Sequence, residues 1–312
     1  MKLFRMLTVL LAVLCMAISG KAFAAANDVQ AFRDAFSAAM DSSKGYHLEL
    51  MFHGPTFQSN ILADSRLGMD GSCTMDGTMR WSYTDTVSGT SKDSEMPFYA
   101  ERNGNVLALY GNRQGVWQCD NVLAGVTWIL DAVSSEDKDT RAKYAAAVSD
   151  VKITNAANGQ KCMQITFDGK ALASVQDKAV RSRIASMSAA DQKEAMEYLR
   201  YINAALADTN PEVTWTVDKK TGKTVIVVAN LTDILRSYAK TMLQDSYQGN
   251  ISLPPQETEF LAALGYYYEL QLYLTSSDAK TDVNIPANVK QNAKASNLFN
   301  DIEAEVISVV QK

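Results

Sequence analysis

Residues that could carry out chemistry are few in this chain of 312 residues. His47 and His53 are the only histidines, and six residues of extended strand would hold them about 20 Å apart, too far to share one metal ion. No cysteine pair has zinc-site spacing, and the chain lacks both a Gly-x-Ser-x-Gly elbow and a phosphate-binding glycine loop. The acidic cluster at 136–139 is typical of a solvated surface. We therefore predict no enzyme activity, no catalytic or metal-binding residue and no cofactor.

The cysteines leave two interpretations open. Cys73, Cys119 and Cys162 follow the leader described below, and an odd number permits one disulfide or none. Cys73 and Cys119 both lie on aromatic-bearing faces of predicted strands, the second beside Trp117. A Cys73–Cys119 disulfide is therefore the preferred pairing, and three reduced thiols are the alternative.

The first 24 residues have the layout of a secretory signal peptide. Residues 1–5 are positively charged, residues 6–20 are apolar, and residues 22–24 form a small-x-small exit. The apolar run is shorter than the roughly 20 residues that a membrane-spanning helix needs. Bulky residues precede Cys15, which does not fit a lipoprotein signal. We expect a cleaved, unlipidated and soluble product that is periplasmic or secreted and is not an integral membrane protein.

Charge argues against nucleic acid as a partner. Removal of residues 1–24 takes away three of the 30 basic residues, which leaves 27 against 35 acidic residues and a net charge of −8. An acidic chain without basic runs is a poor match for phosphate backbones or anionic lipid surfaces. We therefore exclude nucleic-acid binding as a main role.

The elements that must position any site begin with a helix at 28–43, followed by strands in which apolar residues recur every second position. The clearest alternation runs from Cys73 to Tyr83, longer than the roughly 5–6 residues of an ordinary strand. Such a strand must twist and curl, and Gly77 on its apolar face permits a bend. Long curled strands wrap around a packed helix, a second sheet or a cavity.

Turn signals divide the remaining chain. Hairpins are predicted around Asn103-Gly104, Asn158-Gly159 and 218–222. Helices are predicted at 122–133, 170–208, 231–242, 254–264 and 296–310, and further strands at 266–274 and, as an edge strand, at 283–286. The fold class is α+β: a curled antiparallel sheet, or half-barrel, with helices covering the concave face. We expect one domain over 25–312, with a helical insert at about 170–208 and a C-terminal helix at 296–310.

The apolar face of the long strand is the candidate ligand surface. Met79, Trp81 and Tyr83 are expected to line a cavity, and the apolar helix at 122–133 would cover it through Val126, Ile129 and Leu130. An ordinary core, in which these side chains pack against their own helices, is the alternative.

A family resemblance supports the cavity. Asp282-Val-Asn-Ile-Pro286 with Val289 and Ala293, and Trp215-Thr-Val-Asp218 with Thr221-Gly222, resemble segments of bacterial lipoprotein-carrier (Lol-type) domains and related uncharacterised exported proteins. The resemblance implies a curled sheet with helices across its mouth, holding a lipid or acyl chain. The chain is longer than the simple carriers, and no ligand-contacting residue of that family can be matched here.

Two functions follow as hypotheses. The first is an exported protein that binds or carries an apolar ligand, a lipid or acyl chain, in the concavity of its sheet. The alternative is a cell-envelope protein-interaction module with a filled core and no ligand, whose partners would be envelope proteins.

Overall fold

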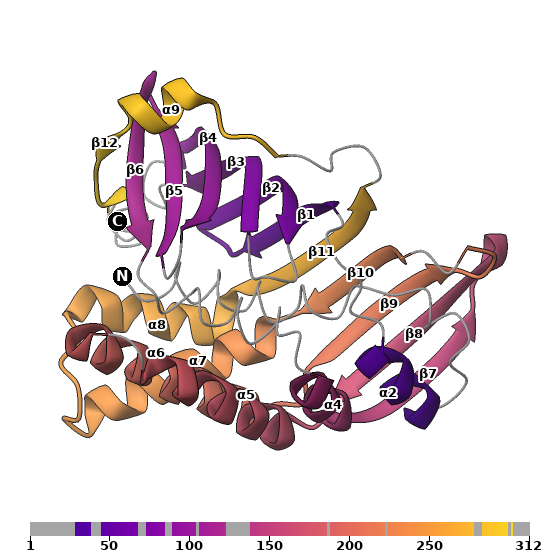
Figure 1. Ribbon diagram of the computed structural model, residues 1–312. Coiled ribbons are helices and arrows are strands. Elements are labelled where there is room, and N and C mark those ends of the chain that lie inside the picture. The colour runs from indigo at the N-terminus through magenta and orange to yellow at the C-terminus, as the bar shows by residue number, and fades with distance from the viewer. Residues whose placement is uncertain are drawn as a thin grey trace.

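A computed structural model describes residues 29–38, 45–67, 73–84, 89–103, 106–122, 138–185, 188–221, 224–277, 283–298 and 301. Within these ranges a 12-stranded sheet is the largest feature (Figure 1). Its strands are β1 (Gly45–His53), β2 (Phe57–Leu67), β3 (Cys73–Thr84), β4 (Ser91–Asn103), β5 (Val106–Arg113), β6 (Val116–Val122), β7 (Val148–Asn155), β8 (Gln160–Phe167), β9 (Glu212–Asp218), β10 (Thr224–Asn230), β11 (Glu269–Ser277) and β12 (Lys294–Ala295).

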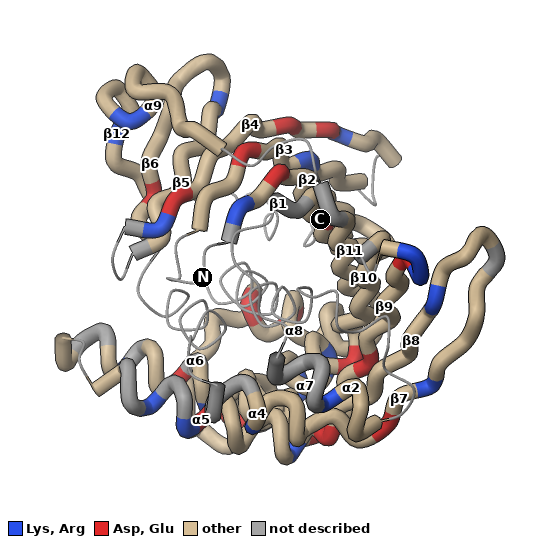
Figure 2. Tube along the Cα trace, turned by 45° about the vertical axis from the view of Figure 1, so that its right-hand side comes forward, with Lys and Arg blue, Asp and Glu red and all other residues tan. Residues whose placement is uncertain are grey.

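The sheet consists of two meanders, β1 to β6 and β7 to β10, and β11 joins them. The strand order is β12-β6-β5-β4-β3-β2-β1-β11-β10-β9-β8-β7, with all neighbours antiparallel except β12 beside β6. Strand β11 pairs with β1 from Gly45↔Ser277 to His53↔Glu269 and with β10 on its other side. The sheet is not closed, and it curls from β6 round to β7 (Figures 1 and 2). The predicted α+β fold with a curled antiparallel sheet is confirmed.

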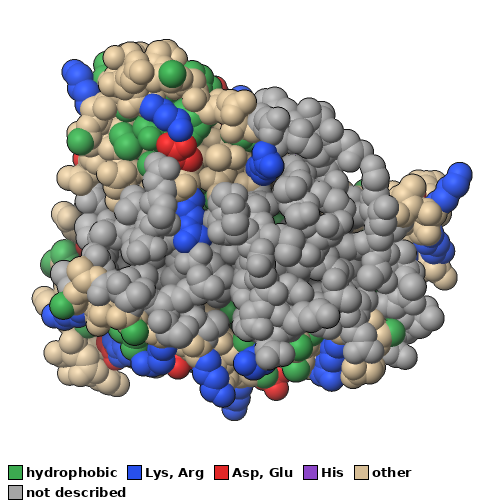
Figure 3. All heavy atoms as spheres, viewed as in Figure 1, with side chains coloured by type: hydrophobic (Ala, Val, Ile, Leu, Met, Phe, Trp, Pro, Cys, Tyr) green, Lys and Arg blue, Asp and Glu red, His purple; other side chains and the backbone are tan. Residues whose placement is uncertain are grey.

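A helical layer closes the open side of the curl. The helices are α2 (Val29–Ala38), α4 (Lys138–Ala146), α5 (Gly169–Ile184), α6 (Ala189–Ala207), α7 (Thr232–Tyr247), α8 (Pro255–Tyr267) and α9 (Ala287–Asn292). Helices α5 to α8 lie side by side, α7 packs on β11, and α2 and α4 pack on β7 (Figure 1). Lys and Arg side chains project along the lower edge of Figure 3, where this layer lies, while its apolar side chains join the core.

Alternation along the strands divides the sheet into an inner apolar face and an outer face. On β3 the odd positions face inward: Cys73, Met79 and Trp81 are buried, and Met75 and Tyr83 pack against the same core. A Cβ atom at Gly77 would lie 2.3 Å from the carbonyl oxygen of Leu62. Glycine therefore lets β2 and β3 approach closely at the predicted point.

Part of the outer face is also apolar. Tyr110 and Ala108 of β5 pack with Val289 of α9, and Trp117 and Cys119 of β6 lie against the same cluster. Residues 283–286 were predicted as an edge strand, but they form an irregular segment that leads into α9. The edge pairing comes later, where Lys294 and Ala295 run parallel to β6. Proline at 286 lacks an N–H and begins a helix more readily than it extends a strand.

Turn chemistry explains two hairpins. Asn158 (φ 66°) and Gly159 (φ 73°) both adopt positive φ between β7 and β8, as Asn-Gly pairs favour. Between β9 and β10 the Asp218 carboxylate accepts hydrogen bonds from the backbone N–H groups of Lys220 and Thr221 and from the Thr221 hydroxyl. These bonds to Thr221 and Lys220 lower the pKa of Asp218. Both predicted hairpins are confirmed.

The predicted helical segment at 170–208 is present as α5 and α6. Tyr266 was placed in a strand, but α8 continues through Tyr267 and β11 starts at Glu269. Three consecutive tyrosines fit the period of a helix and that of a strand, so the alternation in the sequence predicts the start of this strand too early. The leader 1–24, residues 123–133 of the helix predicted at 122–133 and most of the helix predicted at 296–310 lie outside the described residues, and Val122 ends β6.

Candidate ligand-binding face

The candidate site is the inner face of β1 to β4, where inward side chains of neighbouring strands form largely apolar cross-strand rows. One row pairs Leu50 with Ile61, Ile61 with Met79 and Met79 with Met96. The next joins Phe52, Ser59, Trp81 and Ser94 in the same way. Each neighbouring strand adds one inward side chain per row, so a single apolar surface spans the strands.

The surface continues across β11 into the second meander. Leu48, Leu50 and Phe52 of β1 face Leu274, Leu272 and Leu270, and the rows extend further to Val227 and Trp215. All of these side chains are buried in one hydrophobic cluster that also includes the inner sides of the helices. The Phe32 ring of α2 packs edge-on against the Trp215 ring, with 6.3 Å between the ring centroids.

An aromatic group marks one end of this face. The Phe52 ring stacks on Tyr268 at 4.9 Å between centroids and lies 5.8 Å from Phe57. The Tyr268 hydroxyl is 3.1 Å from the Thr56 hydroxyl oxygen, and burial raises the pKa of Tyr268. A Cβ at Gly54 would fall 2.2 Å from the same ring. Glycine is therefore required where β1 ends under Tyr268.

The predicted cavity residues of β3 lie together on this face. Met79 and Trp81 are 3% and 4% exposed, and Tyr83 is half-buried with the Lys92 ammonium 5.5 Å from its ring centroid. Trp81 also has an unusual feature, because its buried Nε1–H has no hydrogen-bond acceptor. Val126, Ile129 and Leu130 lie outside the described residues, so their covering role stays a prediction.

Sequence reasoning missed the other members of the face. Phe52, Ser59, Met96 and Leu272 complete the rows beside Met79 and Trp81. The alternation of apolar residues in each strand predicts a buried face, but it does not predict which strands pair with β3 and β1.

The predicted Cys73–Cys119 disulfide is wrong, and Cys73, Cys119 and Cys162 are all free thiols. Cys73 faces inward on β3, whereas Cys119 faces outward on β6, opposite Tyr110. Three strand-to-strand steps separate β3 from β6, about 14 Å, and a disulfide tolerates no more than about 7 Å between Cα atoms. An aromatic-bearing face suggested the inner side, but Tyr110 and Trp117 make the outer face at β6 aromatic as well, and Val289 of α9 packs on it.

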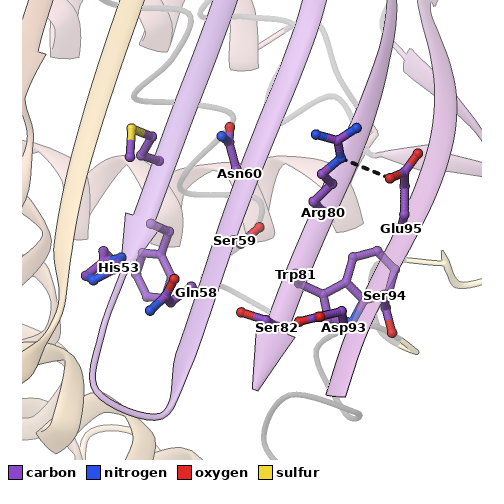
Figure 4. A pocket seen from close by; sticks show the side chains of 12 residues that line it. His53, Gln58, Ser59, Asn60, Arg80, Trp81, Ser82, Asp93, Ser94 and Glu95 are labelled. Carbon is purple, nitrogen blue, oxygen red and sulfur yellow. Dashed lines mark hydrogen bonds and ion pairs between the residues drawn. The ribbon is translucent and has the colours of Figure 1, made fainter. Parts of the chain in front are cut away.

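A partly polar hollow of about 480 Å³ lies at β1 to β4 (Figure 4), and outward residues line it together with Phe52, Ser59, Trp81 and Ser94 of the inner row. Its outward side chains form two cross-strand rows: Met51, Asn60, Arg80 and Glu95, and His53, Gln58, Ser82 and Asp93. Arg80 Nε donates to Glu95 Oε2 at 2.9 Å, and Asn60 Nδ2 donates to Glu49 Oε1 at 3.0 Å. Both members of the Arg80–Glu95 pair are more than half exposed, so the pair is well solvated. We interpret this hollow as ordinary polar surface.

Both histidines also lie on the outer face of β1 and are exposed. His47 Nδ1 is 3.2 Å from Asp64 Oδ1 on the neighbouring strand. Across the described ranges no group of three or more His, Cys, Asp or Glu residues converges on a point where a metal ion could bind.

A second hollow, of about 490 Å³, lies between α7 and α8 on the helical layer. Its rim carries Tyr247 and Tyr266, which are 77% and 78% exposed, and Tyr267 beside them is 66% exposed. Inside it, Asp208 accepts a hydrogen bond from the Ser237 hydroxyl at 3.0 Å and lies 3.5 Å from the Lys240 ammonium. Exposed tyrosines around polar groups resemble the composition of protein interfaces.

Comparison with known proteins adds little to this geometry. No family model matches the chain, and no curated protein matches it. Among solved structures, LprF from Mycobacterium bovis is similar at 13% identity and a TM-score of 0.39, over 83% of this chain and 95% of that one. We draw no argument from a likeness at that level. Among the described helices, none is long and apolar enough to cross a membrane.

Proposed function

We propose that this chain is an exported protein that binds an apolar ligand, a lipid or acyl chain, against the inner face of its curled sheet. The observation that carries the proposal is the largely apolar inner face, which crosses the two meanders in register and is interrupted by few polar side chains, Ser59 among them. A curled, unclosed sheet whose open side is covered by helices is an architecture in which an apolar ligand can be enclosed.

Export rests on the leader alone. Residues 1–24 have the sequence of a signal peptide, and the mature product would then be periplasmic or secreted. We propose no catalytic role.

Native mass spectrometry of protein purified without detergent tests the binding proposal. We expect masses that exceed the mature chain by one or more lipids, and organic extraction should return the protein to its bare mass. A bare mass from the start, together with no uptake of added fatty acids, would contradict ligand binding.

The interaction-module alternative is favoured by one observation, the exposed tyrosines beside the hollow between α7 and α8. It predicts that a cross-linker attached at Tyr266 captures a defined envelope protein in the cell. The same cross-linker at Val116, an exposed side chain on β6, serves as the matched control.

A further inference from the structure

Gln176 is a polar side chain in an apolar environment. It lies on the face of α5 that carries Leu172 and Ala173, and only 1% of its surface is exposed. Neither its Nε2 nor its Oε1 atom has a hydrogen-bond partner. A glutamine amide offers two donors and an acceptor oxygen, and buried amides in folded proteins are nearly always paired. The structure therefore leaves the hydrogen bonds of Gln176 unmade.

The polar residue next to Gln176 shows how α5 normally satisfies such groups. The Asp177 carboxylate accepts hydrogen bonds from Arg181 Nε at 2.6 Å and from Asn203 Nδ2 of α6 at 3.1 Å. Asp177 is half-buried at the contact between α5 and α6, whereas Gln176 is buried on the face of α5 that carries Leu172 and Ala173. The Gln176 amide is thus unpaired at both of its polar atoms, while only the Oδ1 atom of the Asn203 amide is unpaired.

A second unpaired group lies on the other wall of the interior. Trp81 Nε1 is buried on the inner face of β3, and an indole nitrogen can only donate. Helix α5 and strand β3 lie on opposite sides of the curl (Figure 2). Each of these two elements therefore carries a buried polar group without a hydrogen-bond partner.

We propose that Gln176 hydrogen-bonds the polar linkage of the bound amphiphile, which deepens and rests on the function proposed above. A secondary amide or a hydroxyl can both donate to Gln176 Oε1 and accept from Gln176 Nε2. An ester carbonyl can only accept, and a hydrocarbon can do neither. The ligand class is therefore an acyl chain whose polar end carries a donor as well as an acceptor, as in an N-acyl amide.

Three probes with the same number of carbon atoms test this assignment: N-methyldodecanamide, methyl dodecanoate and tridecane. Binding to the purified full-length secreted product is followed by displacement of a fluorescent fatty acid. We expect the wild type to bind the amide about tenfold more tightly than the ester, the effect of one well-formed hydrogen bond, and tridecane most weakly.

Gln176→Met keeps the length of the side chain and removes its polar atoms. We expect it to bind the amide and the ester within about twofold of each other. Gln256→Met, at an exposed position of α8, makes the same change away from the interior and should keep the wild-type preference.

Three results would overturn the assignment. The first is equal binding of the amide and the ester by the wild-type protein, a result that does not depend on whether a variant folds. A Gln176→Met protein with the wild-type preference and a higher melting temperature would indicate an unfavourable buried amide, or one bonded to an interior water. A wild type that binds none of the probes would overturn the proposed function as well, which separates the two failures.

Discussion

At the scale of single residues, Asp245 near the end of α7 joins several polar groups. Its carboxylate accepts hydrogen bonds from the buried Tyr201 hydroxyl at 2.9 Å and from Asn250 Nδ2 at 3.2 Å, and it lies 2.6 Å from an Arg200 nitrogen. Burial alone would raise the pKa of Asp245, but these hydrogen bonds outweigh it and hold the pKa below its usual range. The group links α6 to the C-terminal turn of α7.

Asp245→Asn should lower the free energy of unfolding by about 1–3 kcal/mol at pH 7, because a charge-assisted network loses its carboxylate. A depressed folded-state pKa stabilises the protein above the unfolded value, near 3.9, and this contribution disappears as the pH falls through the folded value. Urea unfolding at several pH values should therefore show the gap between wild type and variant closing below about pH 4. A gap that stays constant down to pH 3 would contradict this role.

Cys73 is the buried thiol of the inner face. Its burial, opposed by the nearby Arg102, raises the pKa of Cys73 to about 12. The thiolate is the reactive form, so native protein at pH 8 should leave Cys73 unlabelled by iodoacetamide. Peptide mass mapping should find it labelled only after denaturation, with no disulfide-linked peptide. Rapid labelling of Cys73 in the native state, or a Cys73–Cys119 peptide, would show that β3 and β6 are placed wrongly.

At the scale of elements, the junction of α5 with the turn after α6 depends on one glycine. A Cβ atom at Gly169 would lie 1.8 Å from the Thr209 carbonyl oxygen and 2.0 Å from that of Leu206, both backbone atoms that cannot turn aside. The Gly169 N–H also donates to Asn210 Oδ1 at 3.3 Å. The first turn of α5 is thus held against the end of α6.

Gly169→Ala should cost about 1–3 kcal/mol of stability, because α5 must move away from the Thr209 backbone. Gly265 in α8 is the matched control, since a Cβ there would meet no atom within 4 Å. Gly265→Ala should be neutral or stabilise the protein by up to about 1 kcal/mol through helix propensity. Thermal unfolding of the two variants checks both signs, and equal melting temperatures would contradict the close contact.

Sequence periodicity predicted the helices and strands themselves better than it predicted which strands pair with one another. The alternation in 73–83 correctly assigned an inner face to Met79 and Trp81, and the Asn158-Gly159 turn was placed correctly, because both signals are local. The insertion of β11 beside β1 depends on contacts more than 200 residues apart, which a period of two does not encode. The prediction that Cys119 faces the same side as Cys73 failed for a related reason, since the apolar outer face at β6 is covered by the distant α9.

The candidate site was predictable only in part. Trp81 and Met79 were identifiable because one long strand carries both. The unpaired amide of Gln176 was not, because a lone glutamine on a helix has no sequence signature and its burial arises from the packing of α5 in the core.

At the scale of the whole molecule, two meanders share one inner face, and a helical layer carries charge outward and apolar side chains inward. This arrangement separates two surfaces on which an apolar molecule could bind. One is the interior, bounded by β3 and α5. The other is the tyrosine-rimmed hollow between α7 and α8, with Tyr247 and Tyr266 exposed. Location therefore distinguishes an enclosed ligand from one bound at the surface.

Photolabelling with a dodecanamide that carries a diazirine at its chain end tests the central claim most directly. Peptide mapping after irradiation should place the label on inward residues of β3 and its neighbouring strands, with Met79, Trp81 or Met96 modified. An excess of unlabelled dodecanamide should abolish this labelling. Label confined to Tyr247, Tyr266 or Tyr267 on the outer helical surface, or label that excess ligand does not reduce, would contradict an apolar ligand held inside the curled sheet.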